Sequence, residues 1–245
     1  MKSSNYQRRF YRDWVGNKHV CSEYVVVKET DLQILTDRPV DKDFIKDRVG
    51  VYRREIENYI DKDRRFLTAL KPIEVELNAP LIVSKMSKAS KLANVGPMAA
   101  VAGAIAGFLG RDLLKKGYKN IIIENGGDIF LKTTKPCVIG IYAGRSKIWN
   151  KLGLKIKAKD TPLGIATSSA TLGHSLSFGS ADSVTILARD ASLADSVATA
   201  VCNRVKSKED LSPALNFARS IKGVCGAVII LKNNLISWGR LEFVK

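Results

Sequence analysis

Apolar residues follow two different periods along this chain, and their alternation predicts a protein built of both strands and helices. Residues 24–35 begin with a β-branched run and end in near-alternation of apolar and polar positions, which is typical of a strand. Residues 41–60 instead place Phe44, Val49, Ile56 and further apolar side chains near helical spacing. A charged helix on the surface is therefore expected there.

The longest apolar stretch, residues 92–109, predicts a buried helix that runs towards Lys116. Ser87 or Ser90 is the expected N-cap of a long helix, with Pro97 either near its first turn or at a break. Because the segment is apolar almost all round, we expect it to be buried. Its proline and its glycines give it too little transfer energy for a membrane span, and Gly103 and Gly107 are expected to permit close packing.

Strand and helix signals then recur in much the same order. A buried strand at residues 120–124 leads into an Asn125-Gly-Gly turn. Further strands are expected near residues 138–142, 154–156, 182–188, 224–231 and 235–238, and helices over residues 191–205 and 213–220. No linker separates the halves, so the order predicts one α+β domain, after a short basic-aromatic arm, with an internal duplication of about residues 20–131 and 137–245.

Charge and composition narrow the class of partner. The chain has 245 residues, 45% of them hydrophobic, and its 40 Lys and Arg against 24 Asp and Glu give a net charge of +16. Such an excess suits nucleic acid, but the basic residues are spread from Lys2 to Lys245 and form no stripe. We therefore favour a basic surface that attracts small anionic ligands such as mononucleotides.

The four cysteines and the start of the chain indicate a cytoplasmic protein. The cysteines are far apart and form no Cys-x-x-Cys pair, and with only His19 and His174 available a zinc cluster is not expected. The first ten residues contain no apolar run, so no signal peptide is expected. The cysteines are Cys21, Cys137, Cys202 and Cys225.

Three stretches carry candidate chemistry, and the first is Glu124-Asn-Gly-Gly-Asp128. Paired glycines permit positive φ and let a ligand approach the backbone, while Asp128 supplies an acceptor or a metal ligand. A plain hairpin turn explains the same residues, and on spacing alone it is the stronger interpretation.

The second stretch, residues 165–179, surrounds one histidine with hydroxyls. Such a loop suits a phosphate or a ribityl chain, and His174 is the natural general acid or base. A histidine that merely orders a turn fits equally well. The hydroxyl residues are Thr167, Ser168, Ser169, Thr171, Ser175 and Ser177.

The third stretch places Asp195 and Thr199 one turn apart on one face of a helix. A carboxylate and a hydroxyl so placed can share a hard cation such as Mg²⁺, which takes oxygen ligands. Alternatively, Asp195 only offsets the helix dipole.

Taken together, these motifs resemble the FAD:protein FMN transferase (ApbE) superfamily, and most closely an uncharacterised stand-alone branch of ApbE-like proteins. For that branch the likeness spans almost the whole chain, and for the transferases proper it covers roughly residues 86–204. The motifs are Glu124-Asn-Gly-Gly-Asp128, Ala166-Thr-Ser168, His174, Ser183-Val-Thr185, Ala194-Asp-Ser-Val-Ala-Thr199 and, for the branch alone, Arg9-Phe-Tyr-Arg12, Glu29-Thr-Asp-Leu32 and the segment of residues 95–103.

The resemblance implies a tandem T-fold-like arrangement, ββααββ repeated in two layers, that binds FAD or FMN between helices and sheet. It also implies Asp195 and Thr199 as Mg²⁺ ligands, His174 and Asp195 as catalytic residues, and FMN transfer to a hydroxyl of a protein acceptor. The expected flavin contacts are Asn125, Gly126, Gly127, Asp128, Thr167, Ser168, Ser169 and Thr171.

Two departures from the transferases bear on catalysis. Residues 97–100, Pro-Met-Ala-Ala, stand where the transferases carry a lysine, and His174 is followed by Ser175 and not by an Asp-Pro stretch. A non-catalytic flavin or nucleotide carrier is therefore an alternative, as is a sulfur-metabolism factor acting through Cys21 or Cys202. A nucleic-acid-binding module fits less well, and the sequence leaves a homo-oligomer open.

Overall fold

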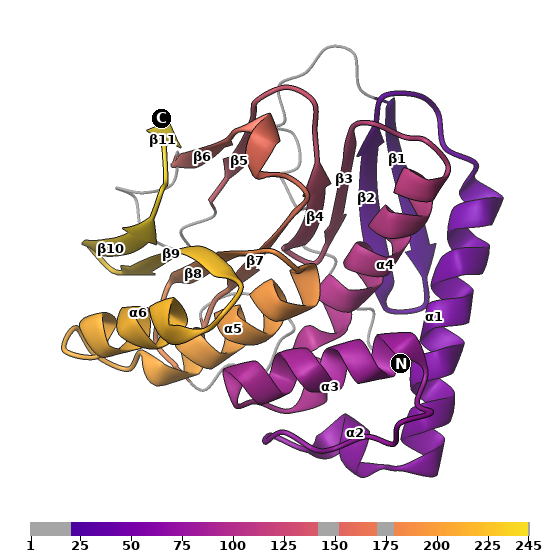
Figure 1. Ribbon diagram of the computed structural model, residues 1–245. Helices are drawn as coiled ribbons and strands as arrows, with labels where there is room; N and C mark the ends of the chain where they lie inside the picture. Colours follow the sequence, from indigo (N-terminus) through magenta and orange to yellow (C-terminus); the bar gives the residue numbers. More distant parts are fainter. Residues whose placement is uncertain (1–20, 142–151, 171–178, 245) are drawn as a thin grey trace, which may run out of the picture.

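An eight-stranded antiparallel sheet forms the frame of the protein, and a second sheet of three short strands lies against it (Figure 1). The structure, a computed structural model, describes residues 21–141, 152–170 and 179–244. In the large sheet the order is β1-β2-β3-β4-β7-β8-β9-β10, and in the small sheet it is β11-β6-β5. The strands are β1 (Cys21–Val27), β2 (Thr30–Thr36), β3 (Ile121–Asn125), β4 (Asp128–Lys132), β5 (Cys137–Gly140), β6 (Gly153–Ile156), β7 (Leu163–Ser168), β8 (Ser183–Ala188), β9 (Val224–Leu231), β10 (Asn234–Gly239) and β11 (Phe243–Val244).

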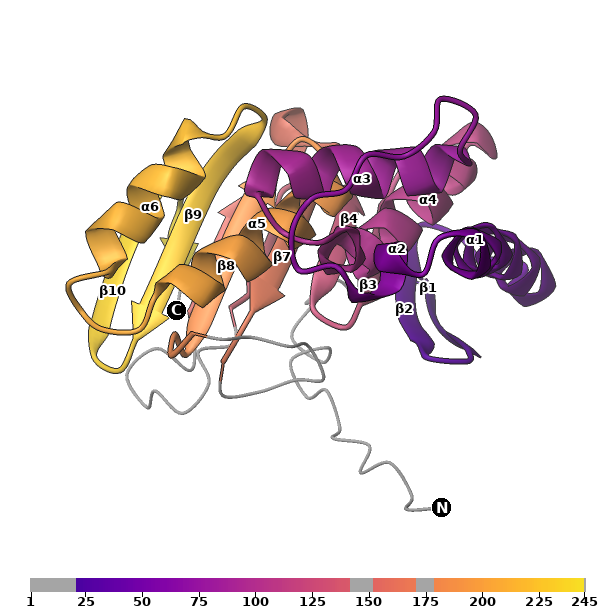
Figure 2. The ribbon, with the colours of Figure 1, turned by 90° about the horizontal axis from the view of Figure 1, so that it is seen from below.

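Helices cover one face of the large sheet (Figures 1 and 2). α4 packs on β3 and β4, α5 on β7 and β8, and α6 on β9, while α3 lies across α5 and α4 as an outer element. The helices are α1 (Lys42–Lys62), α2 (Arg65–Thr68), α3 (Leu81–Ala93), α4 (Val101–Lys115), α5 (Ala191–Arg204) and α6 (Leu211–Ser220), with short 3-10 turns η2 (Pro97–Ala100) and η3 (Ala158–Asp160).

The first elements follow the sequence pattern with one correction. Residues 24–35 form not a single strand but a hairpin of β1 and β2, which reverses at Lys28, where φ is +53°. The expected helix α1 is confirmed, and the carboxylate of Asp41 caps it by accepting from the amides of Asp43 and Phe44.

The long apolar helix is wrong as predicted, because two helices stand in its place. α3 begins at Leu81 and ends at Ala93, and the left-handed backbone of its C-cap Asn94 (φ +57°) turns the chain before Pro97. Ser87 and Ser90 lie inside α3, and their hydroxyls donate to the carbonyls of Ile73 and Ser87. Neither serine is therefore an N-cap.

The segment from η2 through α4 is the apolar run that remains. Pro97–Lys115 is long and apolar enough to cross a membrane by length and composition, but 61% of its most apolar window is buried inside the protein. Core helices pass the same test, and the burial of Ala104 and Leu109 fits a core helix.

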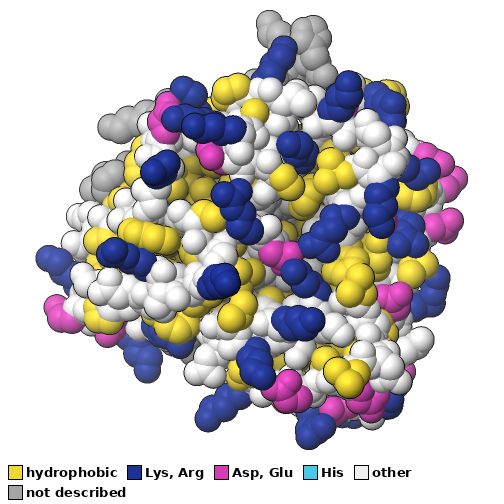
Figure 3. All heavy atoms as spheres, in the orientation of Figure 1, with side chains coloured by type: hydrophobic (Ala, Val, Ile, Leu, Met, Phe, Trp, Pro, Cys, Tyr) yellow, Lys and Arg dark blue, Asp and Glu magenta, His cyan; other side chains and the backbone are white. Residues whose placement is uncertain are grey.

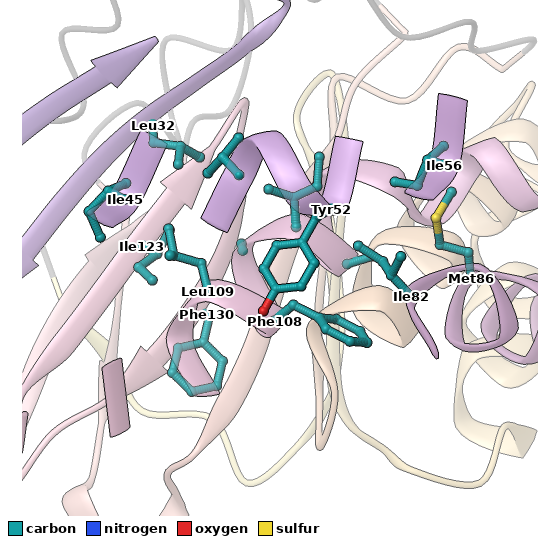
Figure 4. Close-up of a cluster of buried hydrophobic side chains, with 14 of the residues drawn as sticks. Leu32, Ile45, Tyr52, Ile56, Ile82, Met86, Phe108, Leu109, Ile123 and Phe130 are labelled. Carbon is teal, nitrogen blue, oxygen red and sulfur yellow. The ribbon is translucent and has the colours of Figure 1, made fainter. Parts of the chain in front are cut away.

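Two apolar cores sit on the helical side of the large sheet, one in each half, and a third lies between the two sheets. In the first core, Tyr52 of α1 packs edge-on against Phe108 of α4, with ring centroids 5.2 Å apart (Figure 4). Leu109 and Ile123 continue this core towards the sheet.

The two halves of the large sheet share one order of elements: a hairpin, then helices, then a second hairpin. This confirms the expected α+β class, while the duplication itself stays a prediction. β4 pairs with β7 from Asp128↔Ala166 to Leu131↔Leu163, so one continuous ladder joins the halves.

Candidate functional site

The candidate site lies where the β3–β4 hairpin, the beginning of α4 and the first half of α5 meet. Asn125 at the end of β3 donates from its side-chain amide to the carbonyl oxygen of Ala102 at 3.1 Å. The next amide, that of Gly103, donates to the Asp195 carboxylate of α5 at 2.9 Å. These contacts join three segments that are far apart in the sequence.

The two glycines of the hairpin are explained by its turn. Asn125 pairs with Asp128 across Gly126 and Gly127, whose φ angles are +69° and +104°. Positive φ at both central residues is the geometry of a tight two-residue hairpin. Glu124 closes the turn by accepting from the amide of Gly127 at 2.7 Å. The turn interpretation therefore accounts for the glycines without a ligand.

The same turn is tied to the next strand of the sheet. The amide of Thr167 in β7 donates to the carbonyl of Gly127 at 3.2 Å. The expectation of a loop beginning at residue 165 is wrong, since Thr167 and Ser168 belong to β7. The β-branched and apolar residues before them pair with β4 and β8, and this pairing was not visible in the local hydroxyl pattern.

Asp195 is a buried carboxylate held against the first turn of α4. Its relative exposure is 9%. Burial raises the pKa of this carboxyl to about 7, and two backbone amides act in the opposite direction: that of Gly103, which donates to it at 2.9 Å, and that of the neighbouring Ala102. Asp195 therefore does more than offset the dipole of its own helix, α5. It contacts the N-terminal end of α4, where the dipole of α4 favours a negative charge.

Gly103 permits this contact because α4 and α5 touch there. A Cβ atom at Gly103 would lie 2.2 Å from the carbonyl oxygen of Ala191 and 2.9 Å from the Cβ of Asp195. At Gly107 the nearest atom to such a Cβ is the Ala191 side chain at 3.6 Å, which is ordinary contact. The expected packing role is confirmed for Gly103 and is not required at Gly107.

The other predicted residues divide between the two faces of the sheet. Side chains alternate along a strand, so Asp128 lies on the same face as Phe130, and Ser168 on the same face as Ala166. Phe130 and Ala166 belong to the two cores on the helical side of the sheet. Thr167 lies on the opposite face, where its hydroxyl is 3.0 Å from that of Thr185 in β8. The helical face therefore holds Asp128, Ser168 and Asp195, but not the Thr167 side chain.

Three further predicted positions complete the account. Thr199 lies one turn after Asp195 on α5 and is half-buried. Ser169 follows β7 directly. His174 and Thr171 lie outside the described residues, so their roles stay predictions.

The oxygen donors of α5 fit Mg²⁺ in the way this ion usually binds nucleotides. Among residues 21–141, 152–170 and 179–244, no three His, Cys, Asp or Glu side chains gather into a metal cluster. Mg²⁺ does not need one, because it commonly uses one or two carboxylates plus substrate phosphates and keeps several waters. A buried carboxylate with a raised pKa is also a group that a cation stabilises in its charged form.

Sequence reasoning missed the amides of Ala102 and Gly103 as partners of Asp195. The two ends of this contact are 92 positions apart, and no local pattern links them. A hollow lined by charged side chains at the C-terminal end of α1 is not part of the site. Its charged groups pair with each other, as in the ion pairs Lys62–Glu76 and Arg65–Asp63.

Known proteins share both the sequence and the fold. The model of the family described as AbpE bacteria matches residues 12–235. The chain belongs to this family. A UPF0280 protein of Methanocaldococcus jannaschii is 42% identical over 230 residues, an alignment that covers 90% of this chain and 92% of the relative. A UPF0280 protein of Methanocella arvoryzae is 41% identical over 215 residues, which cover 88% of this chain and 87% of the relative.

Solved structures place this AbpE family member among ApbE-like folds. The flavin transferase ApbE from Vibrio cholerae superposes with a TM-score of 0.60 at 13% identity, over 89% of this chain and 96% of that one. The ApbE protein from Thermotoga maritima gives 0.57 at 14% identity, over 91% and 96%. The predicted ApbE-like membership and fold are confirmed.

Proposed function

We propose that this protein binds a flavin nucleotide, FAD or FMN, together with Mg²⁺, and that it transfers FMN from FAD to a hydroxyl of a protein acceptor. The observation that carries the proposal is the Asp195 carboxylate, buried against the first turn of α4 beside the Asn125 hairpin. The flavin transferase activity named for the structural neighbours supports the choice of ligand.

In the proposed arrangement, Asp195 and Thr199 hold the metal through one carboxylate and one hydroxyl oxygen. Mg²⁺ bound there would offset the charge of the FAD pyrophosphate. The amides of Ala102 and Gly103 fix the carboxylate, and Asn125 fixes the first turn of helix α4, which carries those amides. Ligand phosphates would approach from the side of Asp128 and Ser168, which share the helical face of the sheet.

The transfer step needs one proton acceptor. The acceptor hydroxyl oxygen forms a new P–O bond to the FMN phosphorus, the bond to the AMP phosphate breaks, and AMP leaves. The hydroxyl proton passes to His174, the general base predicted from the sequence. No oxidant or reductant is consumed.

Isothermal titration with FAD, with and without Mg²⁺, tests the metal-dependent site. Asp195→Asn should abolish the gain in affinity that Mg²⁺ gives the native protein, because a hard cation loses much of its electrostatic attraction with one carboxylate. Asp190→Asn is the matched control, since Asp190 caps the same helix and meets α4 through the Arg111 side chain, whereas Asp195 meets an α4 backbone amide. An unchanged Mg²⁺ effect in Asp195→Asn would reject the site.

A second candidate, a flavin carrier without transferase activity, is favoured by one observation. The turn η2 that leads into α4 is Pro97-Met-Ala-Ala100, so its side chains offer no cation to a phosphate. Incubation with FAD, Mg²⁺ and candidate acceptor proteins separates the two functions. Covalent addition of FMN to an acceptor, seen by mass spectrometry, supports transfer, whereas tight FAD binding without addition supports the carrier.

A further inference from the structure

The helices α3, α4, α5 and α6, which cover the sheet, carry charge of almost one sign. The basic residues of α3, α4, α5 and α6 are Lys85, Lys88, Lys91, Arg111, Lys115, Arg204 and Arg219, and the acidic residues are Asp112 and Asp195. α1 differs, because acidic residues such as Asp47 and Glu55 stand among its basic ones. Figure 3 shows Lys and Arg side chains spread over the helical face of the protein, with few acidic ones among them.

Neither acid within these helices neutralises their surface, and of the three lysines of α3 only Lys91 is paired with an acid from the segment before α3, Glu74. The Asp112 carboxylate is engaged by Arg48 and Tyr52 of α1, and that of Asp195 turns inward to Gly103. Just before α5, Asp190 binds both Lys85 and Arg111, so this cluster keeps a net positive charge. These helices therefore attract a partner with exposed carboxylates or phosphates.

The exposed edge of α3 adds an apolar element to this charge. Leu81, Lys85, Lys88 and Leu92 follow one another at helical spacing on one side, and we call them the α3 stripe. Leu81 is 73% exposed and Leu92 is 52% exposed. At a rise of about 1.5 Å per residue the stripe is about 16 Å long, with lysines between two leucines.

We propose that the α3 stripe is the docking site of a protein partner that presents carboxylates between two apolar side chains, as one face of an acidic amphipathic helix does. Carboxylates would meet Lys85 and Lys88, and the apolar residues would cover Leu81 and Leu92. A nucleic acid backbone has no counterpart for the leucines. A bilayer would favour apolar residues gathered together, with lysines at their margin.

The position of the stripe relates it to the candidate site, and this part rests on the proposed transfer to a protein acceptor. α3 ends at Ala93, and η2 then leads directly into the first turn of α4, where Gly103 contacts Asp195. α3 also packs against α5, which carries Thr199. A partner docked on the stripe would thus lie beside the elements that build the site.

The test uses the full-length protein and a fluorescent helical peptide with glutamates placed between two leucines at the stripe spacing. We expect it to bind at least about tenfold more tightly than a scrambled peptide of the same composition, with affinity falling as salt rises. Lys88→Glu/Leu92→Ser should weaken binding about tenfold. The control Lys46→Glu/Val26→Ser changes charge by the same amount on α1 and β1, and should alter affinity less than about twofold.

Equal affinity for the two peptides, or equal losses in the two variants, would overturn the proposal in favour of general charge attraction. A short oligonucleotide and phosphatidylserine vesicles form the other arms. If either binds more tightly than the peptide and loses that binding in Lys88→Glu/Leu92→Ser, the face serves phosphates and the proposal fails. No flavin or metal is present, so this result is independent of whether FMN transfer occurs.

Discussion

The Asp195 carboxylate accepts a hydrogen bond from the Gly103 amide at 2.9 Å, and this contact fixes α5 against the first turn of α4. It depends on the absence of a side chain at Gly103, because the Ala191 carbonyl occupies the adjacent space. One backbone contact thus sets both the packing of two helices and the position of a candidate ligand.

Gly103→Ala should destabilise the protein by about 1–3 kcal/mol, because its Cβ would lie 2.2 Å from the Ala191 carbonyl oxygen and the helices must separate. Gly107→Ala is the matched control on the same helix. Its Cβ meets only ordinary contact at 3.6 Å, so the higher helix propensity of alanine should leave stability unchanged or raised by up to about 1 kcal/mol. Urea unfolding measures both, and equal effects would contradict the close crossing of α4 and α5.

The hairpin turn should distinguish its two glycines. Gly127→Ala should cost about 1–2 kcal/mol, since alanine rarely adopts a φ of +104°. Gly126→Asn should be nearly neutral, because asparagine tolerates the left-handed region and φ there is +69°. Thermal unfolding compares the two, and a large loss in Gly126→Asn would show that the site needs glycine for a reason beyond the turn.

The hydroxyl pair of Thr167 and Thr185 should behave as a coupled unit. Thr167→Val removes the 3.0 Å partner of the Thr185 hydroxyl, and because Thr185 is only 2% exposed this should cost about 1–2 kcal/mol. Adding Thr185→Val removes that unsatisfied group, so the double variant should recover part of the loss. A double-mutant cycle by denaturant unfolding measures the coupling, and strictly additive losses would argue against the hydrogen bond.

Tyr52 should give stability that disappears in alkali. Burial, with a hydrogen bond to Asp112, raises the pKa of the Tyr52 phenol from 10.0 to about 12. Its contribution is therefore complete below pH 10, the value of an unfolded tyrosine, and is lost as pH rises through about 12. Tyr52→Phe should cost about 1 kcal/mol near neutral pH. Its deficit against the native protein should shrink over that alkaline window. Unfolding curves at several pH values test this, and a constant deficit would contradict the raised pKa.

Sequence periodicity was sufficient for elements whose boundaries are coded locally. Asp41 caps the beginning of α1 and Asp190 caps the beginning of α5. In both helices the capping residue stands where the helical pattern of apolar residues begins, so the two local signals agree. The Asn-Gly-Gly turn likewise predicted the β3–β4 hairpin.

The errors arose where tertiary contacts outweigh local pattern. An apolar run continuous across Asn94 and Pro97 concealed the break between α3 and α4. β7 was missed because its last residues are hydroxyl-rich, and only its pairing with β4 and β8 makes them strand. The site showed the same limit, since the Asp195 helix was expected but its amide partners on α4 were not.

The ladder between β4 and β7 has a mechanical consequence. Backbone hydrogen bonds from Asp128↔Ala166 to Leu131↔Leu163 join the two halves of the large sheet, so this ladder resists bending between the halves in the described part of the chain. Rotation of one half against the other would break the hydrogen bonds between β4 and β7 and would disrupt the packing of α4 against α5. A flavin bound as proposed would therefore meet β4, β7 and the Asp195–Gly103 contact in one fixed arrangement.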